Sequence, residues 1–352
     1  MKIILTGGGT AGHVTPHINM LPELKKHFDK IEYIGSKTGI EKELIKNTGL
    51  PYHSITTCKF VRKKFWQNLS IPFRLAKGVK EAKAILKKAK PNAIFSKGGF
   101  VSVPVVIAAS KLGIPIIAHE SDKSPGLANR LCSKHCKVVF TSFKDTASHI
   151  KNGRYSGPPL ATPPNISKQE AKEKLGISTN LPIMLITGGS LGAKALNTIV
   201  EQNLNELCKS FFIYHITGKG NSSKTSHPNY KQVEFTSAMP LLMRAADFAI
   251  TRGGSNTIFE LAQNHVPMLI VPLPKGNSRG DQEENAAYFE SNGLSITLEQ
   301  NAATSESLAE SLKLLRTHAT RMQAAQKEFS KTDAIKTIAK ELVCQAKSSP
   351  LR

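Results

Sequence analysis

The feature that most constrains the fold is a set of glycine clusters, each of which directly follows a short apolar run. The clusters lie at residues 7–12, 98–99, 188–192 and 253–254, and each is followed by a segment with helical spacing of apolar residues. Short apolar runs that alternate with amphipathic helices are typical of a parallel sheet covered by helices. Such sheets bind ligands at the carboxyl ends of their strands, which is where these clusters fall. The sequence therefore predicts an α/β protein whose glycine-rich turns hold a ligand.

The expected strands form two groups separated by a proline-rich segment. They lie at residues 2–6, 31–34, 52–55, 93–95, 115–118 and 137–140, and at residues 182–187, 211–216, 232–235, 247–250 and 267–271. Four prolines and a glycine between residues 156 and 164 forbid regular helix there and mark a linker. We therefore predict two Rossmann-like domains facing a central cleft, over residues 1–157 and 158–331. The chain after residue 304 is expected to be helical, and a helix at about 332–346 to pack back on the first domain.

Charge and composition narrow the choice of partner. The chain has 48 Lys and Arg against 26 Asp and Glu, a net charge of +22, so we expect an anionic partner. Aromatic residues make up 6% and no nucleic-acid-binding motif is found, so we do not expect nucleic acid. No apolar stretch approaches the roughly 18 to 20 residues of a membrane span. The N-terminus looks like a buried strand rather than a secretory signal, which predicts a cytoplasmic protein.

Two other kinds of site are weighed and not favoured. The five scattered cysteines do not form a disulfide framework, and Cys132, His135 and Cys136 lack a second ligand pair for zinc, so we expect no metal site. The first glycine cluster matches the dinucleotide fingerprint, but the next expected strand does not end in the acidic residue that would hold a ribose. No P-loop is present either, which argues against an ATPase.

A strongly basic segment lies between residues 59 and 90, with eleven basic residues against the single acid Glu81. Apolar and aromatic residues are interleaved with the lysines, which indicates an interfacial membrane contact. The alternative is an ordinary amphipathic helix with its apolar side in the core. The residues predicted to contact the membrane are Lys63, Lys64, Phe65, Trp66, Phe73 and Arg74.

The glycine clusters and three further motifs resemble the MurG family, peptidoglycan N-acetylglucosaminyltransferases with a two-domain B fold. The resemblance runs along nearly the whole chain, at residues 8–16, 97–102, 119–122 with 125–129, 188–193, 252–256 with Glu260, and 279–282 with Asn285. Three positions depart from the family pattern: Ala11 replaces a usual glycine, Leu191 a common glutamine, and Ala161 an arginine that follows the interdomain motif. The last departure puts donor contacts from the linker in doubt.

The resemblance implies an inverting transfer of N-acetylglucosamine from UDP-N-acetylglucosamine to lipid I, the undecaprenyl-diphosphate-linked muramyl-pentapeptide, giving lipid II without a cofactor. It implies a peripheral protein at the cytoplasmic face of the bacterial plasma membrane. Its partners would be the two substrates, an anionic membrane surface and other enzymes of cell-wall synthesis. A diacylglycerol acceptor and a non-enzymatic protein that binds nucleotide sugars or nucleic acid are the alternatives.

The reaction needs a base for the acceptor hydroxyl and positive groups for the departing UDP. His13 is the first candidate for the base because imidazole titrates near neutral pH, and the carboxylates of Glu120 and Asp122 compete with it. By resemblance, the UDP-sugar contacts are Thr10, Ala11, Gly12, Asp122, Gly189, Ser190, Thr236, Glu260, Asp281 and Gln282. The loops for the acceptor diphosphate contain Gly9, Gly98, Gly99 and Asn129.

Overall fold

The computed structural model describes residues 1–59, 65–189, 193–276 and 279–348 of the chain. The chain divides into two compact units. The first contains Met1–Ala161 together with Thr332–Arg352, and the second contains Thr162–Lys331. The boundary therefore follows Ala161, whereas the sequence interpretation put it after Gly157. Each unit has its own parallel sheet and its own hydrophobic core.

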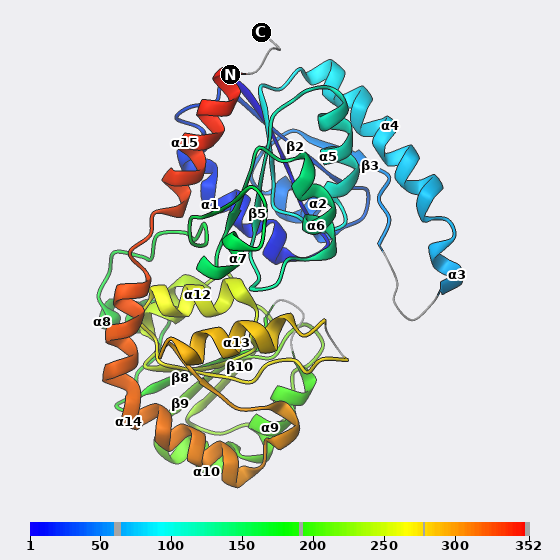
Figure 1. Ribbon diagram of the computed structural model, residues 1–352. Coiled ribbons are helices and arrows are strands. Elements are labelled where there is room, and N and C mark those ends of the chain that lie inside the picture. Colours follow the sequence, from blue (N-terminus) through cyan, green and yellow to red (C-terminus); the bar gives the residue numbers. More distant parts are fainter. Residues whose placement is uncertain (60–64, 190–192, 277–278, 349–352) are drawn as a thin grey trace. The chain divides into compact units, whose positions relative to one another are not determined.

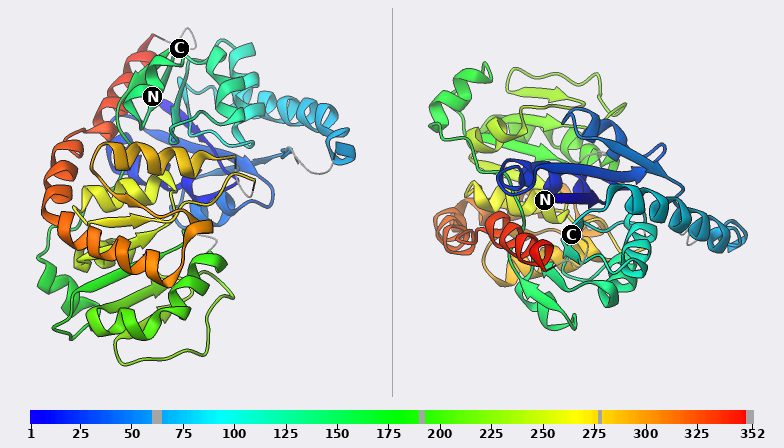
Figure 2. Two further views of the ribbon diagram at one scale, coloured as in Figure 1. Left: turned by 60° about the horizontal axis from the view of Figure 1, so that its bottom comes forward. Right: turned by 90° about the horizontal axis from the view of Figure 1, so that it is seen from above.

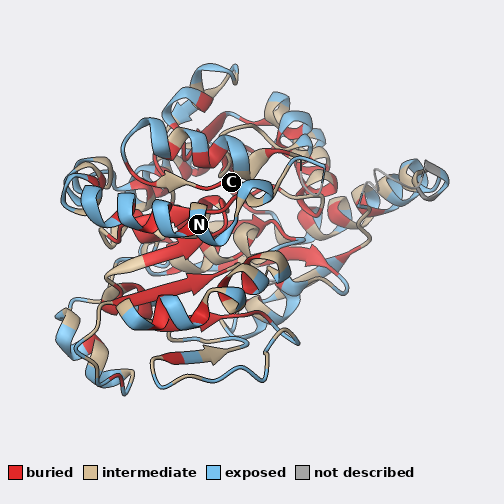
Figure 3. Ribbon diagram, turned by 90° about the horizontal axis from the view of Figure 1, so that it is seen from below, coloured by how far each residue is buried: buried red, intermediate tan, exposed pale blue. Residues whose placement is uncertain are grey.

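The sheet of the first unit has seven parallel strands in the order β3-β2-β1-β4-β5-β6-β7. Their bounds are β1 (Lys2–Thr6), β2 (Lys30–Ser36), β3 (Tyr52–Ile55), β4 (Ala93–Ser96), β5 (Ile116–Glu120), β6 (Val138–Thr141) and β7 (Gly153–Tyr155). The central strands are almost wholly buried, as their continuous apolar runs require (Figure 3). The strand order reverses between β1 and β4, and ligands of such sheets bind where it reverses.

Helices cover both faces of this sheet (Figure 1). They are η1 (Ala11–His13), α1 (Thr15–Leu24), α2 (Ile40–Lys46), α3 (Phe65–Asn68), α4 (Ile71–Ala89), α5 (Ser102–Lys111), α6 (Leu127–Cys132), η2 (Ser133–His135), α7 (Lys144–Ser148) and α15 (Ala334–Lys347). The C-terminal helix α15 lies beside α1 and buries Ile338 and Leu342 in the same core cluster as Met20 and Leu24. The last segment of the chain thus belongs to the core of the first unit.

The sheet of the second unit has six parallel strands in the order β10-β9-β8-β11-β12-β13. The strands are β8 (Ile183–Thr187), β9 (Phe212–Ile216), β10 (Tyr230–Val233), β11 (Phe248–Thr251), β12 (Met268–Ile270) and β13 (Ile296–Thr297). The helices are α8 (Lys168–Lys174), α9 (Lys194–Gln202), α10 (Leu204–Ser210), α11 (Met239–Ala245), α12 (Ser255–Gln263), α13 (Asp281–Ser291), η3 (Gln300–Ala302) and α14 (Ser305–Phe329). Here the order reverses between β8 and β11, the two strands that precede glycine clusters.

Three expectations about elements were wrong. Strands β7 and β13 were not expected, because pairs and triplets of residues leave no apolar run to recognise. Strand β10 begins two residues earlier than expected, at Tyr230. The C-terminal helical region is interrupted: α14 ends at Phe329, and α15 begins after Asp333, whose side chain caps it by accepting from the Lys336 amide at 3.1 Å. Among the described residues, no helix is long and apolar enough to cross a membrane.

Candidate active site

The first glycine loop leaves β1 and is fixed by a buried carboxylate. The Gly9 amide donates to Glu41 Oε2 at 3.2 Å, and the amide of Ser36 at the end of β2 donates to Glu41 Oε1 at 3.1 Å. Gly8 has φ +154°, and a Cβ there would lie 2.6 Å from the Glu41 carboxyl carbon. A side chain at position 8 would therefore displace the carboxylate that ties this loop to α2. Sequence reasoning missed Glu41, since nothing in its local pattern links it to a loop 32 residues away.

The second glycine loop leaves β4 and packs directly on the first. Gly98 and Gly99 have φ of +84° and +77°, values that favour glycine. A Cβ on Gly99 would lie 2.1 Å from the Gly8 carbonyl oxygen and 3.3 Å from His13 Nδ1. A Cβ on Gly98 would lie 2.6 Å from Asn129 Oδ1. The structure thus brings together the two glycine loops, His13 and Asn129.

His13 closes the 3-10 turn η1 after Thr10, Ala11 and Gly12, and its side chain is half-buried. The Thr10 hydroxyl and His13 Nδ1 lie 2.9 Å apart. If Nδ1 carries the proton and donates it to Thr10 Oγ1, then Nε2 carries the lone pair that a base requires. A hydrogen bond from Nδ1 to the Thr10 hydroxyl therefore favours the tautomer in which Nε2 can accept a proton.

Glu120 ends β5 and is buried, and each of its oxygens accepts hydrogen bonds. Oε1 accepts from the Asp122 amide at 3.0 Å, and Oε2 accepts from the Gly126 amide and Asn129 Nδ2, each at 2.9 Å. Burial and the nearby Asp122 charge raise the pKa of Glu120, and the hydrogen bonds oppose that shift. Glu120 thus organises the loop that carries Asp122, which is itself half-buried. Asn129 Nδ2 donates to this carboxylate and to the His119 carbonyl oxygen.

In the second unit, the third glycine loop leaves β8. Gly189 has φ +81°, its amide donates to Thr187 Oγ1 at 3.3 Å, and no described atom lies within 4 Å of where its Cβ would be. The loop leads to α9, whose first residue is Lys194. The predicted contact Ser190 lies outside the described residues. Thr236 follows β10, and its hydroxyl accepts from the Ala238 amide at 3.0 Å, next to the exposed Phe235.

Glu260 is the sixth residue of α12, the helix that follows the fourth glycine cluster. Its surroundings raise the pKa of its carboxyl to about 7, because burial disfavours the charged form. No described residue donates a hydrogen bond to this carboxylate. A half-buried carboxylate to which no described residue donates is suited to accept from two hydroxyl groups of a ligand, as the ribose of a nucleotide would supply.

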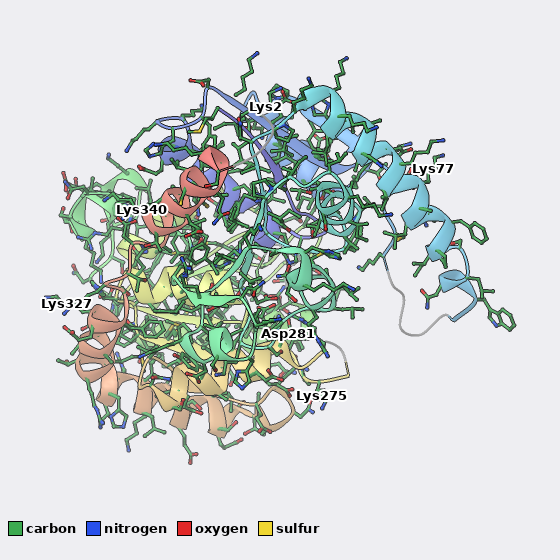
Figure 4. All side chains as sticks on the ribbon, turned by 45° about the horizontal axis from the view of Figure 1, so that its top comes forward. Lys2, Lys77, Lys275, Asp281, Lys327 and Lys340 are labelled. Atoms are coloured by element: carbon green, nitrogen blue, oxygen red, sulfur yellow. The ribbon has the colours of Figure 1, made fainter. Side chains whose placement is uncertain are left out.

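The start of α13 packs against the same cluster. A Cβ on Gly253 would lie 2.4 Å from the Gln282 carbonyl oxygen, and Asn285 Nδ2 donates to the Gly253 carbonyl at 3.0 Å. Asp281, labelled in Figure 4, is the first residue of the helix, and its Oδ1 lies 3.6 Å from Arg279 Nε. Gln282 Oε1 accepts from the Leu273 amide at 3.0 Å, which leaves its Nε2 group as the side-chain donor for a ligand.

Arg252 and Arg154 have structural partners. Arg252 is buried and donates to the carbonyl groups of Val271 and Pro272 and to Gln300 Oε1, which ties the ends of β11 and β12 together. Arg154, the arginine nearest in sequence to Ala161, forms an ion pair with Glu341 of α15 at 2.9 Å. Its guanidinium group therefore holds the C-terminal helix on the first unit.

The predicted membrane residues lie in and around α3 and α4. Lys63 and Lys64 lie outside the described residues, and Phe65 is the first residue of α3. Trp66 and Phe73 are 82% and 80% exposed, unusually high values for large apolar side chains. Arg74 is exposed and donates to the Thr57 carbonyl at 2.8 Å, which fastens α4 to the segment after β3.

Comparison with known proteins agrees with this arrangement. The model of the glycosyltransferase family 28 N-terminal domain matches residues 3–141, and that of the family 28 C-terminal domain matches residues 183–342. A protein of Clostridium tetani named UDP-N-acetylglucosamine--N-acetylmuramyl-(pentapeptide) pyrophosphoryl-undecaprenol N-acetylglucosamine transferase is 46% identical over 320 residues, 89% of each chain. A protein of the same name from Clostridium botulinum is 46% identical over 313 residues, 87% of each chain.

Solved structures show the same fold. The crystal structure of Acinetobacter baumannii MurG matches 97% of this chain and 98% of that one, with a TM-score of 0.75 at 25% identity. A glycosyltransferase of kitacinnamycin matches 98% of each chain with the same TM-score at 16% identity, which is a likeness of fold alone. Relatives of this identity match most of the chain, and the two parallel sheets with their glycine loops agree with the MurG structure. The protein therefore belongs to the MurG family of N-acetylglucosamine transferases.

Proposed function

We propose that the protein transfers N-acetylglucosamine from UDP-N-acetylglucosamine to lipid I with inversion at the anomeric carbon, forming lipid II for peptidoglycan synthesis. The observation that carries this proposal is the 46% identity along 89% of the chain to relatives whose names state the reaction. The glycine loops that the family needs are present in both units, with the backbone conformations that only glycine adopts easily.

The second unit would bind the donor. The amide groups at the starts of α9 and α12 point to the carboxyl edge of the sheet, where helix N-termini attract a diphosphate. Glu260 would accept from the ribose hydroxyls, and the backbone at Thr236 would read the uracil edge. Asp281 and Gln282 would hydrogen-bond the donor sugar, and Ser190 the diphosphate. Oriented amide groups, rather than a metal ion, would then stabilise the negative charge of the departing UDP.

The first unit would bind the acceptor and supply the base. We assign the base to His13, since the Thr10 hydroxyl can hold Nδ1 as the protonated nitrogen. Glu120 accepts three hydrogen bonds, so its role would be to position the loop of Asp122, and Asp122 remains the competing base. The loops at Gly9 and residues 98–99 would face the acceptor diphosphate.

The first unit would also contact the anionic membrane that holds lipid I. It carries 31 Lys and Arg against 11 Asp and Glu, a net charge of +20, whereas the second unit carries 17 against 15. Figure 2 shows α3 and the first turns of α4 extending away from the sheet of this unit, with Lys77 farther along the same helix in Figure 4. Exposed aromatic groups ringed by lysines insert at the headgroup level of anionic bilayers. We therefore propose a peripheral protein at the cytoplasmic face of the plasma membrane.

The experiment that tests this function incubates the purified protein with UDP-N-acetylglucosamine and a short-chain lipid I analogue, with EDTA present. We expect UDP and the disaccharide product to appear in equal amounts, since no metal is needed to hold the diphosphate. A diacylglycerol acceptor, offered in parallel, should give no product. UDP-sugar binding without a disaccharide would mean another acceptor, and absence of UDP-sugar binding would overturn the assignment.

A further inference from the structure

A lysine is buried beneath the acceptor loops. Lys97 follows β4 and is 1% exposed, a rare situation for a charged side chain. Its Nζ lies 2.6 Å from His119 Nδ1 and also donates to the Ser121 hydroxyl. Both partners come from β5 and the segment that follows it, which leads to Asp122. The ammonium group therefore joins the second glycine loop to the loop of the candidate carboxylates.

The hydrogen bonds around His119 fix its protonation. Nε2 lies 3.1 Å from the Gly157 carbonyl oxygen, which can only accept, so Nε2 carries the proton. Nδ1 then holds a lone pair and accepts from Lys97. Burial and the Lys97 charge hold the pKa of His119 well below its usual range, in agreement with a neutral ring. Donation therefore runs outward from Lys97, in one direction to the Ser121 hydroxyl and in the other through His119 to the Gly157 carbonyl.

Gly157 is the last residue before the proline-rich linker, and the first unit holds it on several sides. Its amide and that of Ser156 donate to the Thr141 carbonyl at 3.2 Å. It has φ +78°, and a Cβ there would lie 2.3 Å from the Oγ1 of Thr332, the residue at which the chain returns to this unit. The buried lysine is thus connected both to the acceptor segment and, through His119, to the Gly157 peptide, four residues before the chain leaves the unit at Ala161.

We propose that Lys97 is a positioning residue for the transfer reaction: its ammonium group holds the segment at residues 121–122 and, through His119, the Gly157 peptide in the arrangement that accepts the lipid-linked substrate. This proposal rests on the proposed function. Lys97 touches neither the sugar nor the departing UDP in this role and acts through Ser121 and His119. A neutral side chain of the same length would fill the space and lose both hydrogen bonds.

The charge on Lys97 depends on pH in an accessible range. Burial lowers its pKa to about 8, although two carboxylates favour its charged form. The titratable groups that face this cluster are Glu120, Asp122, His13, His17, His119 and Tyr33. The ammonium form predominates below pH 8, so the positioning should weaken as the pH rises above that value.

The test compares the wild-type full-length protein with Lys97→Met and Ser121→Ala, using UDP-N-acetylglucosamine and a short-chain lipid I analogue. We expect each variant to lose roughly tenfold or more in kcat/KM for the acceptor, as loss of a charged hydrogen bond predicts, with KM for the donor changed by less than about twofold. Between pH 7.5 and 9, wild-type acceptor kcat/KM should fall several-fold, and that of Lys97→Met should stay low and flat. Lys111→Met is the control, at the exposed far end of α5.

Two readouts separate positioning from a merely structural role. The first is the ratio of acceptor to donor kcat/KM, which a merely structural role would leave unchanged. The melting temperature of Lys97→Met should fall, because the substitution leaves His119 Nδ1 and the Ser121 hydroxyl without their buried donor. The second is amide hydrogen exchange without substrate, which should quicken in this variant at residues 121–124 and at Gly126, Gly157 and Leu160. Equal losses for donor and acceptor would overturn the proposal, as would acceptor kinetics within about twofold of wild type in both variants. A wild-type protein that gives no disaccharide would instead refute the proposed function.

Discussion

Two glutamates of the candidate site differ in their hydrogen-bond partners: Glu120 is buried among donors, and Glu260 is half-buried without a described donor. Burial raises the pKa of both Glu120 and Glu260, since each leaves water for a medium that disfavours charge. Three donors surround Glu120, and no described residue donates to Glu260. The oxygens of Glu120 therefore already accept hydrogen bonds from the protein, whereas those of Glu260 can accept hydrogen bonds from a ligand.

Donor affinity should therefore depend on the ionisation of Glu260. Its pKa of about 7 leaves the carboxyl mostly protonated at pH 6 and mostly ionised at pH 8. The ionised form accepts more strongly, with one oxygen for each ribose hydroxyl, so the affinity for UDP-N-acetylglucosamine should rise about fivefold to tenfold from pH 6 to pH 8. Calorimetric titration measures this without interference, because the diphosphate diester does not titrate there.

Glu260→Gln should bind the donor weakly and equally at both pH values, since an amide cannot ionise. Glu310→Gln, at an exposed position of α14, is the matched control and should keep the wild-type slope. A slope that survives in Glu260→Gln would assign the titration to another group.

The assignment of the base makes a separate prediction at His13. His13→Ala should lower kcat by about a hundredfold to ten-thousandfold, the usual range for loss of a general base, while UDP-N-acetylglucosamine still binds. Thr10→Val should have a smaller effect, because it removes the tautomer control and keeps the imidazole. Single-turnover kinetics and donor titration measure the two effects. Near-normal turnover of His13→Ala, with loss in Asp122→Asn, would transfer the role to Asp122.

Some of these residues were within reach of sequence analysis and others were not. His13, Glu120 and Glu260 stand in motifs next to glycine clusters, where local pattern carries the information. Glu41 contacts Gly9, 32 residues away, and Lys97 contacts His119, 22 residues away. No local sequence pattern reveals such contacts. The sequence could show that Lys97 precedes Gly98, and it could not show that the side chain turns inward to His119.

At the scale of elements, the packing of two loops explains the glycines better than either loop does alone. Gly99 and Gly113 have similar backbone conformations, with φ of +77° and +70°. A Cβ at Gly99 would meet the Gly8 carbonyl oxygen at 2.1 Å, whereas no described atom lies within 4 Å of a Cβ at Gly113. The two positions therefore share the conformational strain and differ in the clash.

Alanine at each position should separate the two effects. Gly113→Ala should cost about 1 kcal/mol of unfolding free energy and keep turnover, because it adds only strain. Gly99→Ala should cost about 2 kcal/mol more and lose most acceptor turnover, because the first and second loops must move apart. Denaturant unfolding and initial rates measure both. Equal costs at the two positions would mean that the loops do not depend on this contact.

The strands were more predictable than the helix ends. Buried parallel strands are continuous apolar runs bounded by Gly, Pro and polar residues, so the run at residues 2–6 matched its strand β1. The expectation of unbroken helix after residue 304 was wrong, since residues 330–333 leave the helix and Asp333 caps α15. Helical composition continues across that break, and only the packing of α15 against α1 shows that a separate helix belongs to the first unit.

The exposed apolar groups of α3 and α4 predict the membrane contact at the scale of an element. Trp66→Ser with Phe73→Ser should lower binding to anionic vesicles roughly tenfold or more and leave the melting temperature unchanged, since neither side chain is buried. Leu86→Ser, in the buried part of the same helix, should instead lower the melting temperature. Vesicle sedimentation and thermal unfolding distinguish the two. Unchanged vesicle binding in the double variant would return these residues to the class of ordinary surface side chains.

For the whole molecule, almost all of the net positive charge belongs to the first unit. A net charge of +20 on the first unit and +2 on the second means that long-range attraction to an anionic surface acts on the unit that would hold the acceptor. The donor would be held by backbone amides and by Glu260, which need no excess of basic residues. The high isoelectric point near 9.8 is thus a property of one unit rather than of the chain in general.

Salt should therefore separate the two substrates. Raising the salt from about 0.1 to 0.5 M should lower turnover of lipid I in anionic vesicles by about tenfold or more, because screening removes the attraction of the lysines to the membrane. Over the same range the affinity for UDP-N-acetylglucosamine should change by less than about twofold. A water-soluble short-chain acceptor is the control, and its turnover should resist salt because it needs no membrane docking. If salt depressed turnover of both acceptors alike, the basic surface would act on the substrate diphosphate itself, and the membrane would not be its partner.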